Sequence, residues 1–180
     1  MKLTLRAHAD FPSRAFLAIA VGVKRDAASL TLRYRLTGAV ADLAIAAPAA
    51  AARTDELWRH TCFEAFLRPD AGAGYVELNF APSTQWAAYR FSGYRAGMAP
   101  ADIDPPRIEL TKTSASLDLV VRLDLTRLAL PPGPCRLALS AVIEQTDGAK
   151  SYWALAHPPG RPDFHHTAGF AYDLPEKESP

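Results

Sequence analysis

The chain has 180 residues, enough to bury one substantial hydrophobic core and short for two domains. With 49% hydrophobic and 22% charged residues, its composition is that of a globular protein and excludes general disorder. A net charge of +1, spread along the chain, excludes an electrostatic surface for nucleic acid, which requires clustered lysine and arginine.

Two features bear on the cellular compartment. Residues 15–23 (AFLAIAVGV) resemble the apolar part of a signal peptide, but Lys24 and Arg25 follow at once, and the run is far shorter than the ~20 residues of a membrane span. We expect a buried strand there, no export signal and no membrane partner. Cys62 and Cys135 lie in apolar, strand-like surroundings, which favours two buried thiols over a single disulfide. These features predict a cytoplasmic protein.

Alternation of apolar and polar residues dominates the remaining chain and predicts a succession of short strands. In chain order these are residues 29–38, a short strand at 43–46 within an Ala-rich loop, and then 60–69, 75–82, 84–95, 107–112, 116–125, 135–145 and 151–157. Helical periodicity is nearly absent, and fifteen prolines confine the strands. The fold class is therefore all-β, an antiparallel two-sheet β-sandwich with immunoglobulin-like architecture. We expect one domain over residues 1–174 and a polar tail over 175–180.

Two neighbouring strands place polar side chains on one face. In residues 60–69 and 75–82, alternation assigns Glu64, Glu77 and Asn79 to the face opposite the core. A short loop joins the two strands, which indicates antiparallel neighbours, so the three polar side chains share that face. The expected core side consists of Phe63, Ala65, Leu67, Val76, Leu78 and Phe80.

The third strand of this group, residues 84–95, adds either Gln85 and Tyr89 or Trp86 and Arg90 to the polar face. A face with two carboxylates, an amide and aromatic rings is typical of a sugar platform, where rings stack on the sugar and planar polar groups bind its hydroxyls.

Two other interpretations of the carboxylates stay open. Glu64 and Glu77 are alternatively a solvated pair bound to arginines such as Arg33, Arg35 or Arg90. They are also a conceivable acid and base for glycoside hydrolysis, which requires both carboxyls in one cleft. The sequence contains no phosphate-binding glycine loop, nucleophile elbow or zinc-protease motif.

The C-terminal part of the chain gathers histidines around prolines. His157, Asp163, His165 and His166 lie within ten residues, and such side chains can bind zinc. Their spacing matches no established ligand motif, so we expect them to form structural hydrogen bonds instead.

The stretches LWRHTCFEAFLRP, YVELNFAPSTQWAAYRFSGYRAGM and SYWALAHPPGRPDFHH together resemble the bacterial DOMON-like proteins, which are related to family 9 carbohydrate-binding modules. The resemblance covers about residues 30–170. It implies a β-sandwich with a ligand site on or beside one sheet.

The resemblance implies two ligand types. Sugar-binding members of the wider superfamily hold a sugar end between two tryptophans, for which Trp58, Trp86 and Trp153 are available here. Haem-binding members use methionine and histidine as axial ligands, and Met98 is the internal methionine of this chain. Sugar-binding relatives tend to be exported parts of larger enzymes, whereas we expect a single domain with no export signal here, which argues against a polysaccharide as the natural ligand.

We therefore predict a non-catalytic module that binds a carbohydrate or sugar-like small molecule on one sheet face, with no cofactor. The alternatives are a haem-binding electron-transfer domain, a glycan-processing enzyme and a protein-interaction module with an exposed apolar patch. Nothing in the sequence specifies an oligomeric state. The predicted ligand-binding residues are Trp58, Glu64, Glu77, Asn79, Trp86 and Arg90.

Overall fold

The structure is a computed structural model that describes residues 1–13, 15, 17–26, 28–128, 130, 131 and 133–175. The strands of the described residues are β1 (Lys2–Ala7), β2 (Ala18–Arg25), β3 (Ser29–Thr37), β4 (Cys62–Pro69), β5 (Tyr75–Phe80), β6 (Trp86–Phe91), β7 (Ala99–Pro100), β8 (Arg107–Lys112), β9 (Ser116–Asp124), β10 (Cys135–Glu144), β11 (Lys150–Ala154) and β12 (Tyr172–Leu174). The helices are single 3-10 turns, namely η1 (Val40–Asp42), η2 (Leu57–Arg59), η3 (Thr126–Leu128) and η4 (Thr167–Gly169).

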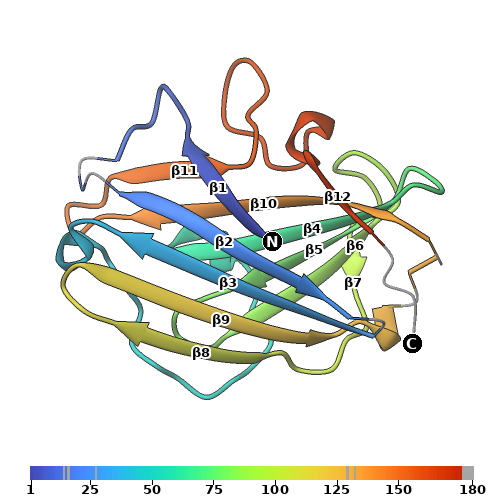
Figure 1. Ribbon diagram of the computed structural model, residues 1–180, viewed down its shortest axis with the longest axis horizontal. Coiled ribbons are helices and arrows are strands. Elements are labelled where there is room, and N and C mark those ends of the chain that lie inside the picture. Colours follow the sequence, from blue (N-terminus) through green and yellow to red (C-terminus); the bar gives the residue numbers. More distant parts are fainter. Residues whose placement is uncertain (14, 16, 27, 129, 132, 176–180) are drawn as a thin grey trace.

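One antiparallel sheet folds over on itself to make two layers (Figure 1). The fold occurs at β1, whose residues 2–5 pair with β2 while Arg6 and Ala7 pair with β11. The first layer has the strand order β1-β2-β3-β9-β8. The second layer has the order β11-β10-β4-β5-β6-β7, with β12 also paired to β10. The all-β antiparallel prediction is confirmed, but the two sheets are continuous along one edge rather than separate.

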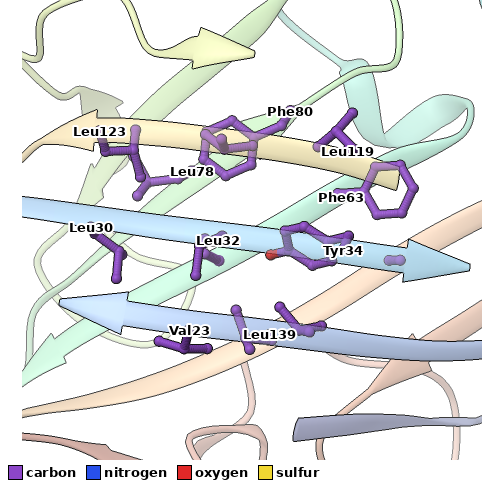
Figure 2. Close-up of a cluster of buried hydrophobic side chains, with 14 of the residues drawn as sticks. Val23, Leu30, Leu32, Tyr34, Phe63, Leu78, Phe80, Leu119, Leu123 and Leu139 are labelled. Atoms are coloured by element: carbon purple, nitrogen blue, oxygen red, sulfur yellow. The ribbon is translucent and has the colours of Figure 1, made fainter. Parts of the chain in front are cut away.

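The core lies between the two layers (Figure 2). In β3 the predicted alternation holds, because Leu30, Leu32 and Tyr34 are fully buried while Arg33 and Arg35 point outward and are exposed. Fully burying a side chain of this size contributes roughly 1.5–3 kcal/mol. Side chains from β2, β3 and β9 meet side chains from β4, β5 and β10, including Val23, Leu119, Leu123, Phe63, Leu78, Phe80 and Leu139.

A hydrogen bond also crosses between the layers inside the core. The hydroxyl of Tyr34 donates to the backbone carbonyl of Glu64 at 2.8 Å. A buried tyrosine hydroxyl needs such a partner, since an unpaired one costs about as much as a lost hydrogen bond. This bond anchors β4 at the residue whose side chain points to the opposite face.

The structure bears differently on three predicted segments. Residues 43–46 are not a strand, because only Leu43 makes a bridge, to Gln145, and an alanine-rich segment offers few side chains to hold a sheet face. The apolar run at residues 15–23 does contribute to a buried strand, which begins at Ala18 and ends at Arg25. Of the predicted tail, residues 176–180 lie outside the described residues.

Both cysteines are buried and neither forms a disulfide, which confirms the prediction of two buried thiols. None of the helices in the described part of the chain is long and apolar enough to cross a membrane.

Candidate functional site

The strands of the second layer sort their side chains onto two faces. Phe63 of β4 and Leu78 of β5 belong to the core between the layers. Glu64 lies opposite Asn79 across the β4–β5 pair, and Glu77 lies opposite Tyr89 across the β5–β6 pair. Residues that lie directly opposite share a face. Residues two apart in one strand, such as Glu77 and Asn79 on β5, also share a face. The predicted common face of Glu64, Glu77 and Asn79 is therefore confirmed.

This outer face is covered rather than solvated. Glu64 is 3% exposed, Glu77 5% and Asn79 0%. A second apolar cluster lies beside them and has its own rings, built from Phe66, Tyr75, Ala87, Tyr89, Phe91, Ala138 and Phe170, with Leu57, Trp58 and Phe164 packed against it. The cover comes from η2 and from the segment that follows β11, which are distant in sequence from β5 and β6.

A cavity of about 550 Å³ opens on this face. Its size falls in the range of small-molecule sites, roughly 300–1,000 Å³. Buried Glu64 and Glu77 form its floor, half-buried aromatic rings stand around them, and cationic side chains lie at its exposed margin. The lining residues are Trp58, Arg59, Glu64, Glu77, Phe91, Arg95, Met98, Val142, Lys150, Tyr152, Pro162, Phe164 and His165.

Each carboxylate of the floor accepts one hydrogen bond, Glu64 from the neighbouring strand β10 and Glu77 from its own strand β5. Ser140 Oγ of β10 donates to Glu64 Oε2 at 3.0 Å, and Asn79 Nδ2 donates to Glu77 Oε1 at 2.7 Å. Burial raises the pKa of Glu64 to about 8, with a further contribution from the nearby charge of Glu77. Burial also raises the pKa of Glu77, against the opposing effects of Asn79 and Arg95. At neutral pH the pair therefore retains a proton.

His165 adds a neutral imidazole beside the floor. Its Nδ1 lies 2.7 Å from the Tyr75 hydroxyl, and its Nε2 lies 3.7 Å from Glu77 Oε2. The rings of Phe66 and Phe91 contact it edge-on. Burial, together with the charge of Arg95, lowers the pKa of His165 to about 4. The histidine therefore brings no positive charge to the carboxylates at neutral pH.

Asp163 ties two loops together at the margin of the cavity. It accepts hydrogen bonds from the Tyr94 hydroxyl, from Arg95 Nη2 at 2.8 Å and from the backbone N–H of His165 at 3.1 Å. Arg95 in turn donates its backbone N–H to the Tyr75 hydroxyl at 3.2 Å. Arg95 has φ of 51°, a conformation that is uncommon for a residue other than glycine. These contacts hold the loops that frame the opening.

The structure divides the predicted ligand-binding residues into two groups. Trp58, Glu64 and Glu77 line the cavity, and Asn79 lies behind Glu77 and holds its carboxylate. Trp86 and Arg90 do not line it.

Alternation along β6 explains why these two residues lie apart from the cavity. Trp86 is 5% exposed and belongs to the core between the layers, where the Arg53 guanidinium lies 4.7 Å from its ring centroid. Arg90 follows on the same side of the strand and donates to the carbonyl of Leu128. Tyr89, from the alternative set, is the residue that shares the face of Glu77.

Most of the remaining lining was not predicted from sequence. Phe91 has the same strand side as Tyr89, so the correct choice for β6 would have found it. Tyr152 lies on β11, and Arg95, Met98 and Phe164 lie on loops, whose approach to the floor leaves no periodic signal. His165 was singled out only as a weak metal candidate.

The four weak metal candidates have separate structural partners. His157 Nε2 lies 2.9 Å from the carbonyl of Arg6, and His166 Nδ1 accepts the Ala168 N–H at the start of η4. Asp163 and His165 belong to the cavity margin and floor, as described above. Among the described residues, no three His, Cys, Asp or Glu side chains gather as a metal-binding group.

Comparison with solved structures links this fold to carbohydrate-binding proteins. A candidate carbohydrate-binding protein from Bacteroides uniformis superposes with a TM-score of 0.66 at 13% identity, over 94% of this chain and 83% of that one. A family 9 carbohydrate-binding module from Caldicellulosiruptor kristjanssonii, in complex with glucose, gives a TM-score of 0.57 at 10% identity, over 98% and 86%. The chain has the fold of these modules.

The same kind of module in complex with cellotriose gives a TM-score of 0.52 at 10% identity, covering 87% of this chain and 74% of that one. No protein-family model and no curated protein matches the sequence. The similarity is therefore one of fold, at identities where side chains of the site are not expected to be shared.

Proposed function

We propose that this protein is a non-catalytic module that binds a carbohydrate or sugar-like small molecule in the cavity of the second layer. The observation that carries the proposal is the cavity of about 550 Å³, in which aromatic rings surround two hydrogen-bonded carboxyl groups. Such a combination suits a sugar, whose C–H faces stack on rings and whose hydroxyls bind planar polar groups. The fold shared with modules solved in complex with glucose and cellotriose supports it.

The lining residues have distinct expected roles. Trp58 and Phe164 are half-buried and offer ring faces or edges to the ligand. Glu64 and Glu77 bind hydroxyl groups at the floor, and Asn79 orients the carboxylate of Glu77 through its 2.7 Å hydrogen bond.

Calorimetric titration with a panel of mono- and oligosaccharides tests the proposal. We expect at least one sugar to bind, and Trp58→Ala and Glu77→Gln each to weaken it by about tenfold, the effect of losing one stacking or charged hydrogen-bond contact. Asp118→Asn, on the outer face of the first layer, is the control and leaves affinity unchanged. The absence of any binding sugar, or binding that ignores both cavity variants, contradicts the proposal.

A second candidate function, glycoside hydrolysis, is favoured by one observation. Glu64 and Glu77 line the same cavity, and the raised pKa of Glu64 is a property of a general acid. Release of chromophore from aryl glycosides, abolished by Glu64→Gln, would establish this activity. Sugar binding without turnover supports the non-catalytic module instead.

The haem alternative fits the cavity poorly. Met98 and His165 both line it, but His165 has the Tyr75 hydroxyl at one ring nitrogen and Glu77 at the other. Axial ligation would require breaking one of these contacts. A protein-interaction module was expected to present an exposed apolar patch and no concave pocket, and the cavity argues against it.

Two further assignments belong to the proposal. We place the chain among the DOMON-like proteins on the motifs quoted above, supported by the shared fold with family 9 modules. We propose a cytoplasmic location, supported by two buried thiols that form no disulfide.

A further inference from the structure

The two carboxylates of the cavity floor have no cationic partner. Among the described residues, no lysine or arginine forms an ion pair with Glu64 or Glu77, and the only basic side-chain nitrogen within ion-pair distance of either is His165 Nε2, 3.7 Å from Glu77. Since His165 is neutral at neutral pH, it does not balance their charge. Buried acids in proteins are normally paired, because an isolated buried charge is costly.

The cations at the margin are already engaged. Arg95 binds Asp163 at 2.8 Å, and Lys150 Nζ donates to the carbonyl of Arg59 at 2.5 Å and lies 4.0 Å from Glu144. Positive charge is thus held at the opening, while the floor stays acidic.

One oxygen on each carboxylate also lacks a hydrogen-bond donor. Ser140 binds Oε2 of Glu64, and Asn79 binds Oε1 of Glu77. Glu64 Oε1 has no donor among the described residues, and Glu77 Oε2 has only the imidazole of His165, at a distance too long for a hydrogen bond. Both side chains are more than nine-tenths buried and line the cavity. Once the proton that the pair retains at neutral pH has left, the cavity therefore presents two acceptors to its ligand.

We propose that the ligand carries a primary ammonium group, as an amino sugar does, and that this ammonium binds between Glu64 and Glu77. The inference rests on the proposed sugar-binding function and specifies its ligand class. An ammonium supplies three donors and a positive charge, whereas a hydroxyl supplies one donor and none. In a site shielded from water this charge is attracted strongly by the two acids, and the surrounding rings also favour a cation.

The proton that Glu64 and Glu77 hold at neutral pH provides a second measurable quantity, the release of a proton on ligand binding. Glu64 is faced by Ser140, Glu77 and the Cys62 thiol, and its backbone carbonyl by Tyr34. Asn79, His165 and Arg95 face Glu77 or act on it. The charge of Glu77 in turn acts on the hydroxyls of Tyr75 and Tyr89. An ammonium that enters between the carboxyls replaces the proton, which leaves to the buffer.

Calorimetry with matched sugars tests this. Glucosamine, galactosamine and mannosamine are titrated at pH 7 beside their neutral parent sugars and their N-acetyl forms, in two buffers of different ionisation enthalpy. We expect an amino sugar to bind about tenfold more tightly than its parent and its N-acetyl form, as one charge-assisted contact provides. We also expect up to one proton to be released, which the neutral sugars do not show.

The variants locate the effect. Glu64→Gln, or Glu77→Gln if the first does not fold, reduces the preference for the amine to less than about twofold and abolishes proton release. Glu109→Gln, on β8 of the first layer, retains both. Equal binding of amino and neutral sugars, or tighter binding of the neutral ones, overturns the amine inference and leaves sugar binding intact. If no sugar binds, both this inference and the proposed function are wrong.

Discussion

The charged residues on the outer faces of the two layers differ in exposure and in ion pairing. On the first layer, Arg33 Nε lies 2.8 Å from Asp118 Oδ1 and the Arg33 side chain is 56% exposed. A second pair, Arg122 and Glu109, is likewise exposed. On the second layer, Glu64 is 3% exposed and has no cationic partner among the described residues.

Alternation alone therefore does not decide whether a polar face is solvated or covered. Both layers alternate apolar and polar residues with the same period, and both direct the apolar side to one core. The first layer leaves its outer face to solvent, where exposed ion pairs contribute about 0–1 kcal/mol. The second layer is covered by η2 and the segment after β11, so its carboxyl groups are buried at a cost in free energy. They nevertheless line a cavity, where a ligand can reach them.

The same comparison settles one alternative from the sequence. Arg33 and Arg35 lie near Asp118 of the first layer, and Arg90 binds the carbonyl of Leu128. None of these arginines neutralises Glu64 or Glu77.

The largest loss of stability is expected for a substitution of Trp86, which lies on the core side of β6 and not on the cavity side. Trp86→Ala should lower the free energy of unfolding by about 3–5 kcal/mol, since it empties a large space in the core. Trp58→Ala removes a half-buried ring of the cavity and should cost less than half as much. Urea denaturation of both variants checks this, and equal losses would mean that Trp86 is not a core residue.

The pH dependence of stability tests the buried carboxyl. Glu64 has its pKa raised from the ordinary 4.5 to about 8, so its proton is held more tightly in the folded state. Its contribution to stability is complete below about pH 4.5 and is lost as the pH rises through about 8. We expect this to lower the free energy of unfolding by roughly 2–4 kcal/mol between pH 5 and pH 9.

Glu64→Gln should remove most of that pH dependence, because an amide does not titrate. The measurement is urea denaturation at several pH values between 5 and 9. Glu109→Gln is the matched control on the exposed face and should follow the wild type. A variant Glu64→Gln with an unchanged slope would show that Glu64 is not the group responsible.

The loop contact at the cavity margin should have a smaller effect. Asp163→Ala removes acceptors for Tyr94, Arg95 and the His165 backbone and should cost about 1–2 kcal/mol. Amide hydrogen exchange should become faster at residues 93–98 and 163–166 and stay unchanged in β3 and β9. Uniform loss of protection would indicate a global rather than a local role.

The smallest effect is expected on the first layer. Asp118→Asn breaks the ion pair with Arg33 in an exposed setting and should change the free energy of unfolding by less than about 1 kcal/mol. The change should shrink further in high salt. A loss as large as that of Asp163→Ala would contradict the contrast between the two faces.

The all-β class, most strand positions and the common face of Glu64, Glu77 and Asn79 could be predicted from the amino-acid sequence. These depend on the period of two residues, which is a local property of an extended chain. β1 was missed, although it joins the two layers, because a short terminal strand gains its stability from its partners β2 and β11 rather than from its own pattern.

Which side of β6 faces the cavity, and which residues cover the carboxyls, depends on contacts between distant segments and could not be predicted from the sequence. Trp86 and Tyr89 are both large rings in one strand, and their sequence positions do not say which one meets the core. Trp58, Tyr152, Phe164 and His165 reach the cavity from η2, β11 and a loop, through contacts between segments far apart in the chain. Burial of Glu64 and the rise of its pKa follow from that cover, so a local pattern cannot contain them.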